Sequence, residues 1–190
     1  MTIGEYGKMI NGEGWLENKT KANLEVIRIK NYNHNLRYEP PVRPSPNLPN
    51  LQSIYLYPSL AFLEKTEVSV GRGTKIQFQI YGHPNFISDF SFTPMPNFGS
   101  QYPKLNGKLS FGEDLRNYKT KDKIELKWLI KSYDQISDKT KFFRSDFDKL
   151  SGISNLKKQI IEGVSESLIR ESWKDGLEKF KKIREKYLLY

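Results

Sequence analysis

The first residues of the chain carry a helical pattern. Four apolar side chains would share one face of a helix: Ile3, Tyr6, Met9 and Ile10. Thr2 and Glu5 have the spacing of a capping box, and Gly12 follows the pattern as a terminator. A short amphipathic helix is therefore predicted to open the chain. Residues 23–29 alternate between polar and apolar positions with period two, which predicts a strand.

Prolines define the next segment. Residues 40–49 contain five prolines, which exclude a regular helix and a central strand and predict a stiff, extended loop. The apolar run 51–63 follows, and its length and leucine content favour a buried helix. Pro58 would kink this helix or lie near its first turns.

Three short alternating runs come after the buried helix. Residues 67–70, 75–80 and 90–93 are predicted to be strands, separated by glycine-containing turns. The segment 94–108 is rich in proline, glycine and asparagine, so we expect a loop there.

The remainder of the chain is predicted to be helical. Residues 124–136 form one expected helix, with Asp122 and Glu125 spaced as an N-cap pair, and residues 154–163 form another. Apolar residues at three- and four-residue steps predict a long C-terminal helix: Leu168, Ile169, Trp173, Leu177, Phe180, Ile183 and Tyr187. Without an internal repeat, this order indicates one α+β domain over residues 1–190. We expect a small mixed or antiparallel, barrel-like sheet with flanking helices.

Composition narrows the class of protein. A chain of 190 residues with 37% apolar content buries one good core, and the absence of cysteine excludes disulfides and thiolate chemistry. No apolar run approaches the roughly 18 residues of a membrane span, and residues 1–5 lack the features of an export signal. The net charge of +9 brings nucleic-acid binding into consideration as a function. Lysines are interleaved with acids in residues 119–127 and 178–186, which favours solvated helix faces instead.

Three segments resemble the exo-β-N-acetylmuramidases of the NamZ family. They are Arg43 to Leu60, Glu67 to Thr74 together with Gly82-His83-Pro84, and Arg184 to Tyr190. Residues 2–15 resemble the entry to the second half of that family, so the likeness spans the chain. Three places depart from the family pattern: Lys65 replaces a usual glycine, Gln77 replaces a usual proline, and Val70 stands where some members have glutamate.

The resemblance implies a periplasmic or secreted enzyme that removes terminal β-1,4-linked N-acetylmuramic acid from peptidoglycan-derived saccharides without a cofactor. It further implies that an N-terminal Rossmann-like domain carries the principal catalytic glutamate, and that this chain is the C-terminal auxiliary domain that closes the cleft. We expect that first domain to be absent here and to be supplied in cis or in trans. A non-catalytic peptidoglycan-binding or glycan-binding module is the alternative.

The turn Gly71-Arg72-Gly73-Thr74 is the first candidate binding element. Backbone N–H groups and the Arg72 fork would suit an anion, and the lactyl carboxylate of muramic acid fits a bidentate guanidinium. The alternative is a glycine-permitted turn with an exposed arginine. His83 is a second candidate, either as a contact to sugar hydroxyls or as a general acid–base group. With only one other histidine, His34, a metal site is not expected.

The proline-rich loop and the helix after it supply the other candidates. Ser45, Asn47, Tyr55 and Tyr57 carry hydrogen-bonding groups on a stiff backbone, although Asn47 could instead cap the following helix. Glycoside hydrolysis requires two flanking carboxyl groups. The chain offers five carboxylates in the middle region, Glu64, Glu67, Asp89, Glu113 and Asp114. Glu64 is the best local candidate because it resembles the position that the family has beside the Gly-Arg-Gly-Thr turn, and the sequence does not identify the pair.

Overall fold

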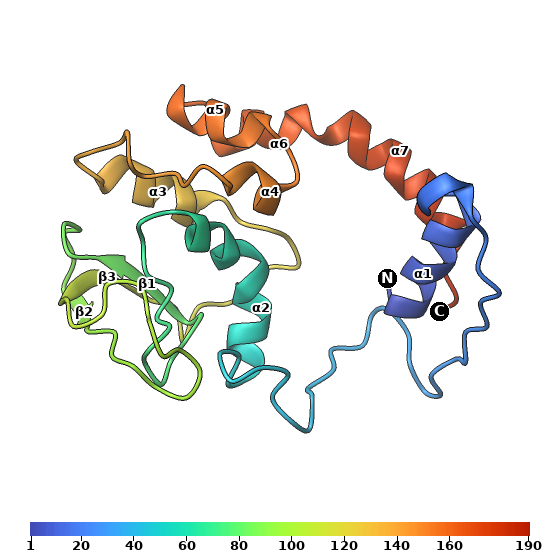
Figure 1. Ribbon diagram of the computed structural model, residues 1–190, viewed down its shortest axis with the longest axis horizontal. Helices are drawn as coiled ribbons and strands as arrows, with labels where there is room; N and C mark the ends of the chain where they lie inside the picture. The colour runs from blue at the N-terminus through green and yellow to red at the C-terminus, as the bar shows by residue number, and fades with distance from the viewer. The chain divides into compact units, whose positions relative to one another are not determined.

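The computed structural model describes residues 1–190 and divides them into two compact units (Figure 1). The terminal unit combines Met1–Tyr38 with Arg170–Tyr190, and the central unit is the continuous segment Glu39–Ile169. The chain is α+β, as predicted, but it forms two units where we expected one domain. None of its helices combines the length and the apolar character that crossing a membrane requires.

The terminal unit begins with helix α1, Ile3–Gly12, and the predicted capping box is present. Thr2 Oγ1 accepts from the Glu5 N–H at 3.3 Å, and Glu5 Oε2 accepts from the Thr2 N–H at 2.6 Å. Glu5 is fully buried and also accepts from the Leu189 N–H at 2.7 Å and from His34 Nε2 at 2.9 Å. One carboxylate thus joins the first helix to the last residues of the chain.

The predicted strand at 23–29 is wrong. These residues have no regular secondary structure, and the short 3-10 helix η1, Glu17–Lys19, is the element that precedes them in the chain. A methyl group on Gly4 would lie 2.5 Å from Val26 Cγ1, and one on Gly7 would lie 3.6 Å from Leu24 Cδ2. Leu24 and Val26, two positions apart, therefore lie at the glycine positions of α1, whereas Ile27 and Ile29 are exposed.

The predicted C-terminal helix is present as two helices. They are α6, Glu166–Ser172, and α7, Lys174–Glu185, which meet at Trp173. In the terminal unit, the Tyr187 hydroxyl donates to Glu13 Oε1 at 2.8 Å, and the Ile29 N–H donates to the Tyr190 hydroxyl at 2.8 Å. These bonds hold the last residues against the first forty.

The central unit opens with helix α2, Leu51–Leu60, which continues as the 3-10 helix η2, Ala61–Lys65. Asn50 caps α2 by accepting from the Ser53 N–H at 3.0 Å, so Asn47 is not the cap. Pro58 lies inside α2, in its last turn and not near its first turns. The later helices of the central unit are α3, Lys127–Gln135, α4, Phe147–Ser151, and α5, Asn155–Ile161. No side chain caps α3, so the expected Asp122–Glu125 N-cap pair does not begin it.

The sheet of the central unit has three antiparallel strands in the order β1-β3-β2. They are β1, Ile80–His83, β2, Phe90–Phe92, and β3, Ser110–Asp114. The sheet is open, with β1 and β2 at its edges, so the barrel-like closure that we expected is not formed. Gly82 and Gly112 are partners across β1 and β3, and a methyl group on Gly112 would lie 1.8 Å from the Tyr81 carbonyl oxygen. A side chain there would force β1 and β3 apart.

Two further predicted strands are wrong. Residues 67–70 contribute only one isolated bridge, Ser69 with Gly82, and residues 71–79 are a series of turns. Gly71, Gly73 and Phe78 all have positive φ, which breaks an extended run. The buried side chains of the central unit nevertheless follow the apolar runs: Leu56, Leu60, Leu63, Val68, Phe78, Ile80, Tyr81, Leu126, Leu129, Phe142, Phe147 and Leu156.

Candidate functional site

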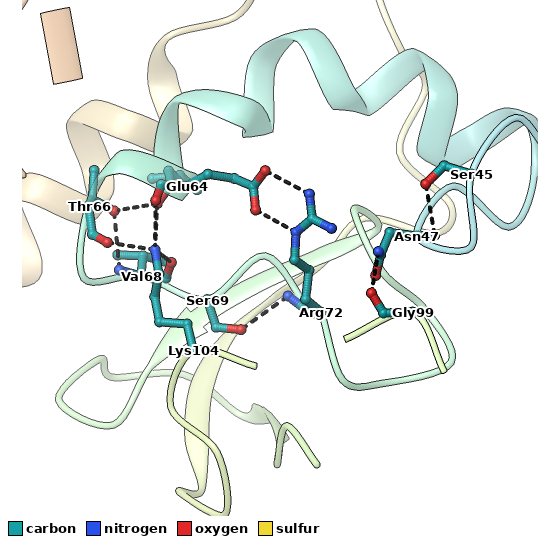
Figure 2. A network of polar contacts seen from close by, with 11 residues as sticks. Ser45, Asn47, Glu64, Thr66, Val68, Ser69, Arg72, Gly99 and Lys104 are labelled. Atoms are coloured by element: carbon teal, nitrogen blue, oxygen red, sulfur yellow. Dashed lines mark hydrogen bonds and ion pairs between the residues drawn. The ribbon is translucent and has the colours of Figure 1, made fainter. Parts of the chain in front are cut away.

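The turn after η2 brings Arg72 against Glu64 (Figure 2). Gly71 and Gly73 both have positive φ, which turns the chain back on itself at Arg72. Arg72 Nε donates to Glu64 Oε1 at 2.5 Å, and Arg72 Nη2 donates to Glu64 Oε2 at 2.8 Å. This contact raises the pKa of the Arg72 guanidinium. The two-bond fork predicted for an external anion is thus directed at a carboxylate of the same chain.

Aromatic rings support the Arg72 side chain. The guanidinium carbon lies 5.0 Å from the centroid of the Phe78 ring, and the Tyr57 ring lies 4.8 Å from Phe78 between centroids. Phe78 is buried and holds a positive φ of 54°, an unusual backbone conformation for a bulky residue. The packing of Tyr57 and Arg72 around this ring accounts for its place in the core.

The Lys104 side chain binds backbone carbonyl groups next to Glu64 (Figure 2). Its Nζ lies within hydrogen-bond distance of four carbonyl oxygens, those of Leu63 at 3.0 Å, Glu64 at 3.2 Å, Thr66 at 2.6 Å and Val68 at 2.9 Å. Burial lowers the pKa of Lys104 to about 8, so the ammonium remains protonated at neutral pH. One cation thereby fixes the path of residues 63–68.

The proline-rich loop forms the wall of a pocket. Asn47 Nδ2 donates to the Gly99 carbonyl at 2.6 Å, and Asn97 Nδ2 donates to the Thr74 carbonyl at 3.1 Å. The first bond joins the loop to the 94–108 segment, and the second joins that segment to the turn at Thr74. The pocket between them, the proline-loop pocket, has a volume of about 240 Å³ and is lined by Arg43, Pro46, Pro49, Thr74, Lys75, Gln77, Asn97, Phe98 and Gly99.

A shallow extension of the proline-loop pocket reaches Ser45. This cavity of about 290 Å³ shares Arg43, Pro46 and Phe98 with the pocket itself. Phe98 is 93% exposed, so its ring is free to stack on a flat ligand. Asn47 Oδ1 is buried and has no hydrogen-bond partner, which is uncommon in folded proteins. Arginine, an exposed ring and backbone polar groups together suit a saccharide with an acidic substituent.

A second, more basic cavity lies beside His83. This His83 cleft has a volume of about 440 Å³ and is lined by Thr66, Glu67, His83, Lys104, Leu105, Lys108, Lys141 and Arg144. Burial lowers the pKa of His83, an effect that Glu67 opposes and that Lys108 and Lys104 reinforce. This shift favours the neutral form of the His83 ring. Its Nδ1 accepts from the Asn85 N–H at 3.2 Å, which leaves the proton on Nε2 as a donor.

The structure distributes the predicted binding residues over three places. Ser45, Asn47 and Thr74 lie at the proline-loop pocket and its extension, whereas His83 lies in its own cleft. Arg72 and Tyr57 belong to the cluster around Phe78, and Tyr55 lies half-buried on α2. Phe98, Lys108 and Arg144 were missed. The signal that the sequence offered for Phe98 was an aromatic residue in a loop rich in proline and glycine.

Most candidate carboxylates have cationic partners. Glu64 pairs with Arg72, Glu113 with Lys131 at 2.5 Å, and Asp114 with Arg116 at 2.6 Å. Glu67 lines the His83 cleft and is exposed, and Asp89 is exposed as well. No group of three or more histidine, aspartate or glutamate side chains is placed to hold a metal ion. Three of the five candidate carboxylates are thus committed to ion pairs.

Comparison with protein families identifies the class of protein. Residues 55–190 match the family model described as "Exo-beta-N-acetylmuramidase NamZ, C-terminal", and residues 1–52 match its N-terminal counterpart. The C-terminal match alone covers more than half of the chain. The chain therefore belongs to the NamZ family.

Individual relatives agree with this membership. The chain is 31% identical over 214 residues to the peptidoglycan β-N-acetylmuramidase NamZ of Bacillus subtilis (strain 168), a match that covers all of this chain and 50% of the relative. A crystal structure of a DUF1343 family protein from Bacteroides fragilis NCTC 9343 has a TM-score of 0.96 and 42% identity, over 100% of this chain and 55% of that one. A second such protein, at 18% identity and TM-score 0.75, shares the fold. The chain spans about half the length of the relatives it matches.

Proposed function

We propose that this chain is the part of an exo-β-N-acetylmuramidase that binds the muramyl saccharide, and that a Rossmann-like N-terminal domain supplies the principal catalytic glutamate. The observation that carries the proposal is the match to a peptidoglycan β-N-acetylmuramidase along the whole chain. The ion pairs of Glu64, Glu113 and Asp114 support it, because hydrolysis needs two carboxyl groups free to act on one bond.

The proline-loop pocket is the proposed saccharide site. Its stiff backbone holds Arg43 and Thr74 beside the exposed Phe98 ring, and a pre-formed site reduces the entropy lost when a ligand binds. Ser45 and Asn47 lie at the same loop and are proposed contacts to sugar hydroxyls. Tyr55, Tyr57, Arg72 and His83 remain proposed contacts from the neighbouring clusters. We propose that the enzyme acts in the periplasm or outside the cell, on peptidoglycan fragments.

Domain assignment is part of the proposal. We assign the chain to the auxiliary half of the enzyme, although residues 1–52 match the N-terminal family model. The sequence models divide the chain near residue 53, whereas the terminal unit combines residues 1–38 with residues 170–190. A domain boundary drawn from sequence alone would thus cut through the contacts of Glu5 with Leu189 and of Glu13 with Tyr187.

A chromogenic N-acetylmuramide tests the proposed function. The 190-residue chain alone is expected to give no turnover, and addition of a Rossmann-like NamZ half, fused or separate, is expected to restore it. Turnover by the chain alone that is abolished in Glu64→Gln would show that the chain carries its own catalytic carboxylate. That result would overturn the requirement for a second domain.

The alternative function is a non-catalytic glycan-binding module. The exposed Phe98 ring at the proline-loop pocket favours it over a general basic scaffold. Sedimentation with purified peptidoglycan in a salt series separates these two. Retention at high salt, without turnover in any combination with a Rossmann-like half, would support the binding module. Binding that collapses steeply with salt would instead indicate a polyanion ligand.

A further inference from the structure

The side chains that line the His83 cleft carry more positive than negative charge. Four cationic side chains line it, Lys104, Lys108, Lys141 and Arg144, against a single carboxylate, that of Glu67. Like charges gathered on one concave surface repel one another, and an anionic ligand removes this cost. The cleft is therefore suited to a negatively charged group.

The four cationic side chains differ in the partners that they already have in the structure. Lys104 Nζ is occupied by backbone carbonyls, and Lys141 lies 3.1 Å from Asp138 Oδ2. Lys108 and Arg144 have no carboxylate partner, and both are exposed at the rim of the cleft. These two side chains are the free charges that a ligand would meet.

A neutral donor completes the arrangement. His83 is half-buried in the wall of the cleft, and its Nδ1 accepts from the Asn85 N–H, so the ring presents Nε2–H as a donor. Leu105, which also lines the cleft, has a positive φ of 59°, a backbone conformation that is costly for leucine. This conformation lies directly after Lys104, whose bonds to the 63–68 backbone fix that wall.

We infer that the His83 cleft binds the oxyanion group of a saccharide ligand, a carboxylate or a phosphate, through Arg144, Lys108 and the His83 Nε2–H. An arginine fork and a lysine are the usual partners of both groups, and the volume of about 440 Å³ leaves room for the body that carries the charge. The inference rests on the proposed function only for the identity of the saccharide. In muramic acid the oxyanion is the lactyl carboxylate, and in a phosphorylated sugar it is the phosphate.

Histidine NMR on the 190-residue chain tests this inference. The chain has two histidines, and His34 lies in the terminal unit, where it contacts Glu5, so its ring signals are an internal reference. The probes are N-acetylmuramic acid, inorganic phosphate and the neutral N-acetylglucosamine, each at constant pH and ionic strength. We expect the first two to shift the His83 ring signals in a saturable manner, and N-acetylglucosamine to leave them unchanged.

Variants assign the effect to the cleft. Arg144→Gln and Lys108→Gln are each expected to weaken anion binding about tenfold, the lower range for one charge-assisted hydrogen bond. Lys123→Gln, an exposed lysine that lines none of the cavities, is the matched control and is expected to bind as the parent chain does. Arg144→Lys keeps the charge without the fork and should fall between the parent and Arg144→Gln.

The outcomes separate the inference from the proposed function. The inference is overturned if neither anion shifts His83, or if N-acetylmuramic acid binds equally well to the parent chain, Arg144→Gln and Lys108→Gln. In the second case the muramyl ligand lies elsewhere and the proposed function stands. Phosphate binding that depends on Arg144 and Lys108, without any binding of N-acetylmuramic acid, supports the oxyanion site and counts against a muramyl ligand in this cleft.

Discussion

Arg72 donates two hydrogen bonds to Glu64, from Nε at 2.5 Å and from Nη2 at 2.8 Å. Both side chains are about a third exposed or less, so the pair is accessible from solvent at one edge. The two guanidinium N–H groups that would bind a lactyl carboxylate are therefore already bound to Glu64. A ligand at Arg72 either uses the remaining Nη1 or opens the pair.

The first prediction concerns Arg72 in the enzyme assembled with a Rossmann-like domain. Arg72→Lys tests whether Arg72, in place of the His83 cleft, contacts the lactyl group: such a contact would lower kcat/KM on an N-acetylmuramide roughly ten- to hundredfold, because an ammonium cannot reproduce the planar fork. Activity on the matching N-acetylglucosaminide should change little. Glu64→Gln is the control that weakens the pair but keeps the fork. Equal losses on both sugars would show that Arg72 only shapes the turn.

The second prediction concerns Phe98 at the proline-loop pocket. Phe98→Ala should weaken binding of a muramyl disaccharide about three- to tenfold, since a stacked ring contributes roughly 0.5–1.5 kcal/mol. The melting temperature should not change, because the ring is 93% exposed. Tyr102→Ala is the matched control: Tyr102 is also 93% exposed and lines none of the cavities described above. Calorimetric titration measures both variants, and equal affinities would remove Phe98 from the site.

The third prediction concerns Lys104. Lys104→Met keeps the length of the side chain but leaves four carbonyl oxygens without their cation, which should cost roughly 2–4 kcal/mol of unfolding free energy. Urea unfolding measures the change. Lys108→Met, at an exposed lysine of the same cleft, should leave stability within about 0.5 kcal/mol of the parent. Similar stabilities for the two variants would show that the four contacts contribute little.

The fourth prediction concerns Glu5 and acid stability. Burial alone would raise the pKa of this carboxyl, but the N–H groups of Leu189 and Thr2 together with His34 lower it to about 2. A lowered pKa means that the stabilisation is complete above pH 4.5, the ordinary value, and is lost as the pH falls toward 2. The melting temperature of the parent chain should therefore fall steeply between these values. Glu5→Gln should be less stable at pH 7 and should lose much of this acid dependence.

The elements that were predicted correctly from the sequence are held by contacts between residues close together in the chain. The capping box of Thr2 and Glu5 and the apolar face of α1 are local features, so they could be read directly. The alternation at 23–29 was misread because its partner is a helix surface at Gly4 and Gly7, which produces the same period as a sheet. Strand β3 was missed because its five residues, Ser110–Asp114, are mostly polar and contain a central glycine that only the close approach to β1 explains.

The candidate sites depend on distant residues, which limited their prediction. The Gly71-Arg72-Gly73-Thr74 turn was identified, but its partner Glu64 was considered only as a catalytic group and not as the ligand of Arg72. The His83 cleft assembles side chains from four separate segments, around residues 66, 83, 104–108 and 141–144. Nothing in the spacing of the lysines indicates which of them converge, because that depends on the path of the loops.

Lys104 also has a consequence for the order in which the central unit forms. The four carbonyl contacts join residues separated by 36 to 41 positions, so the backbone at 63–68 cannot reach its final path until a chain loop of that size has closed. Helix α2 is local and needs no such closure. The His83 cleft, whose walls include both Thr66 and Lys104, is therefore assembled late in folding. A nascent chain that has been synthesised only as far as β2 lacks Lys104, Lys108 and Arg144 and therefore has no cleft.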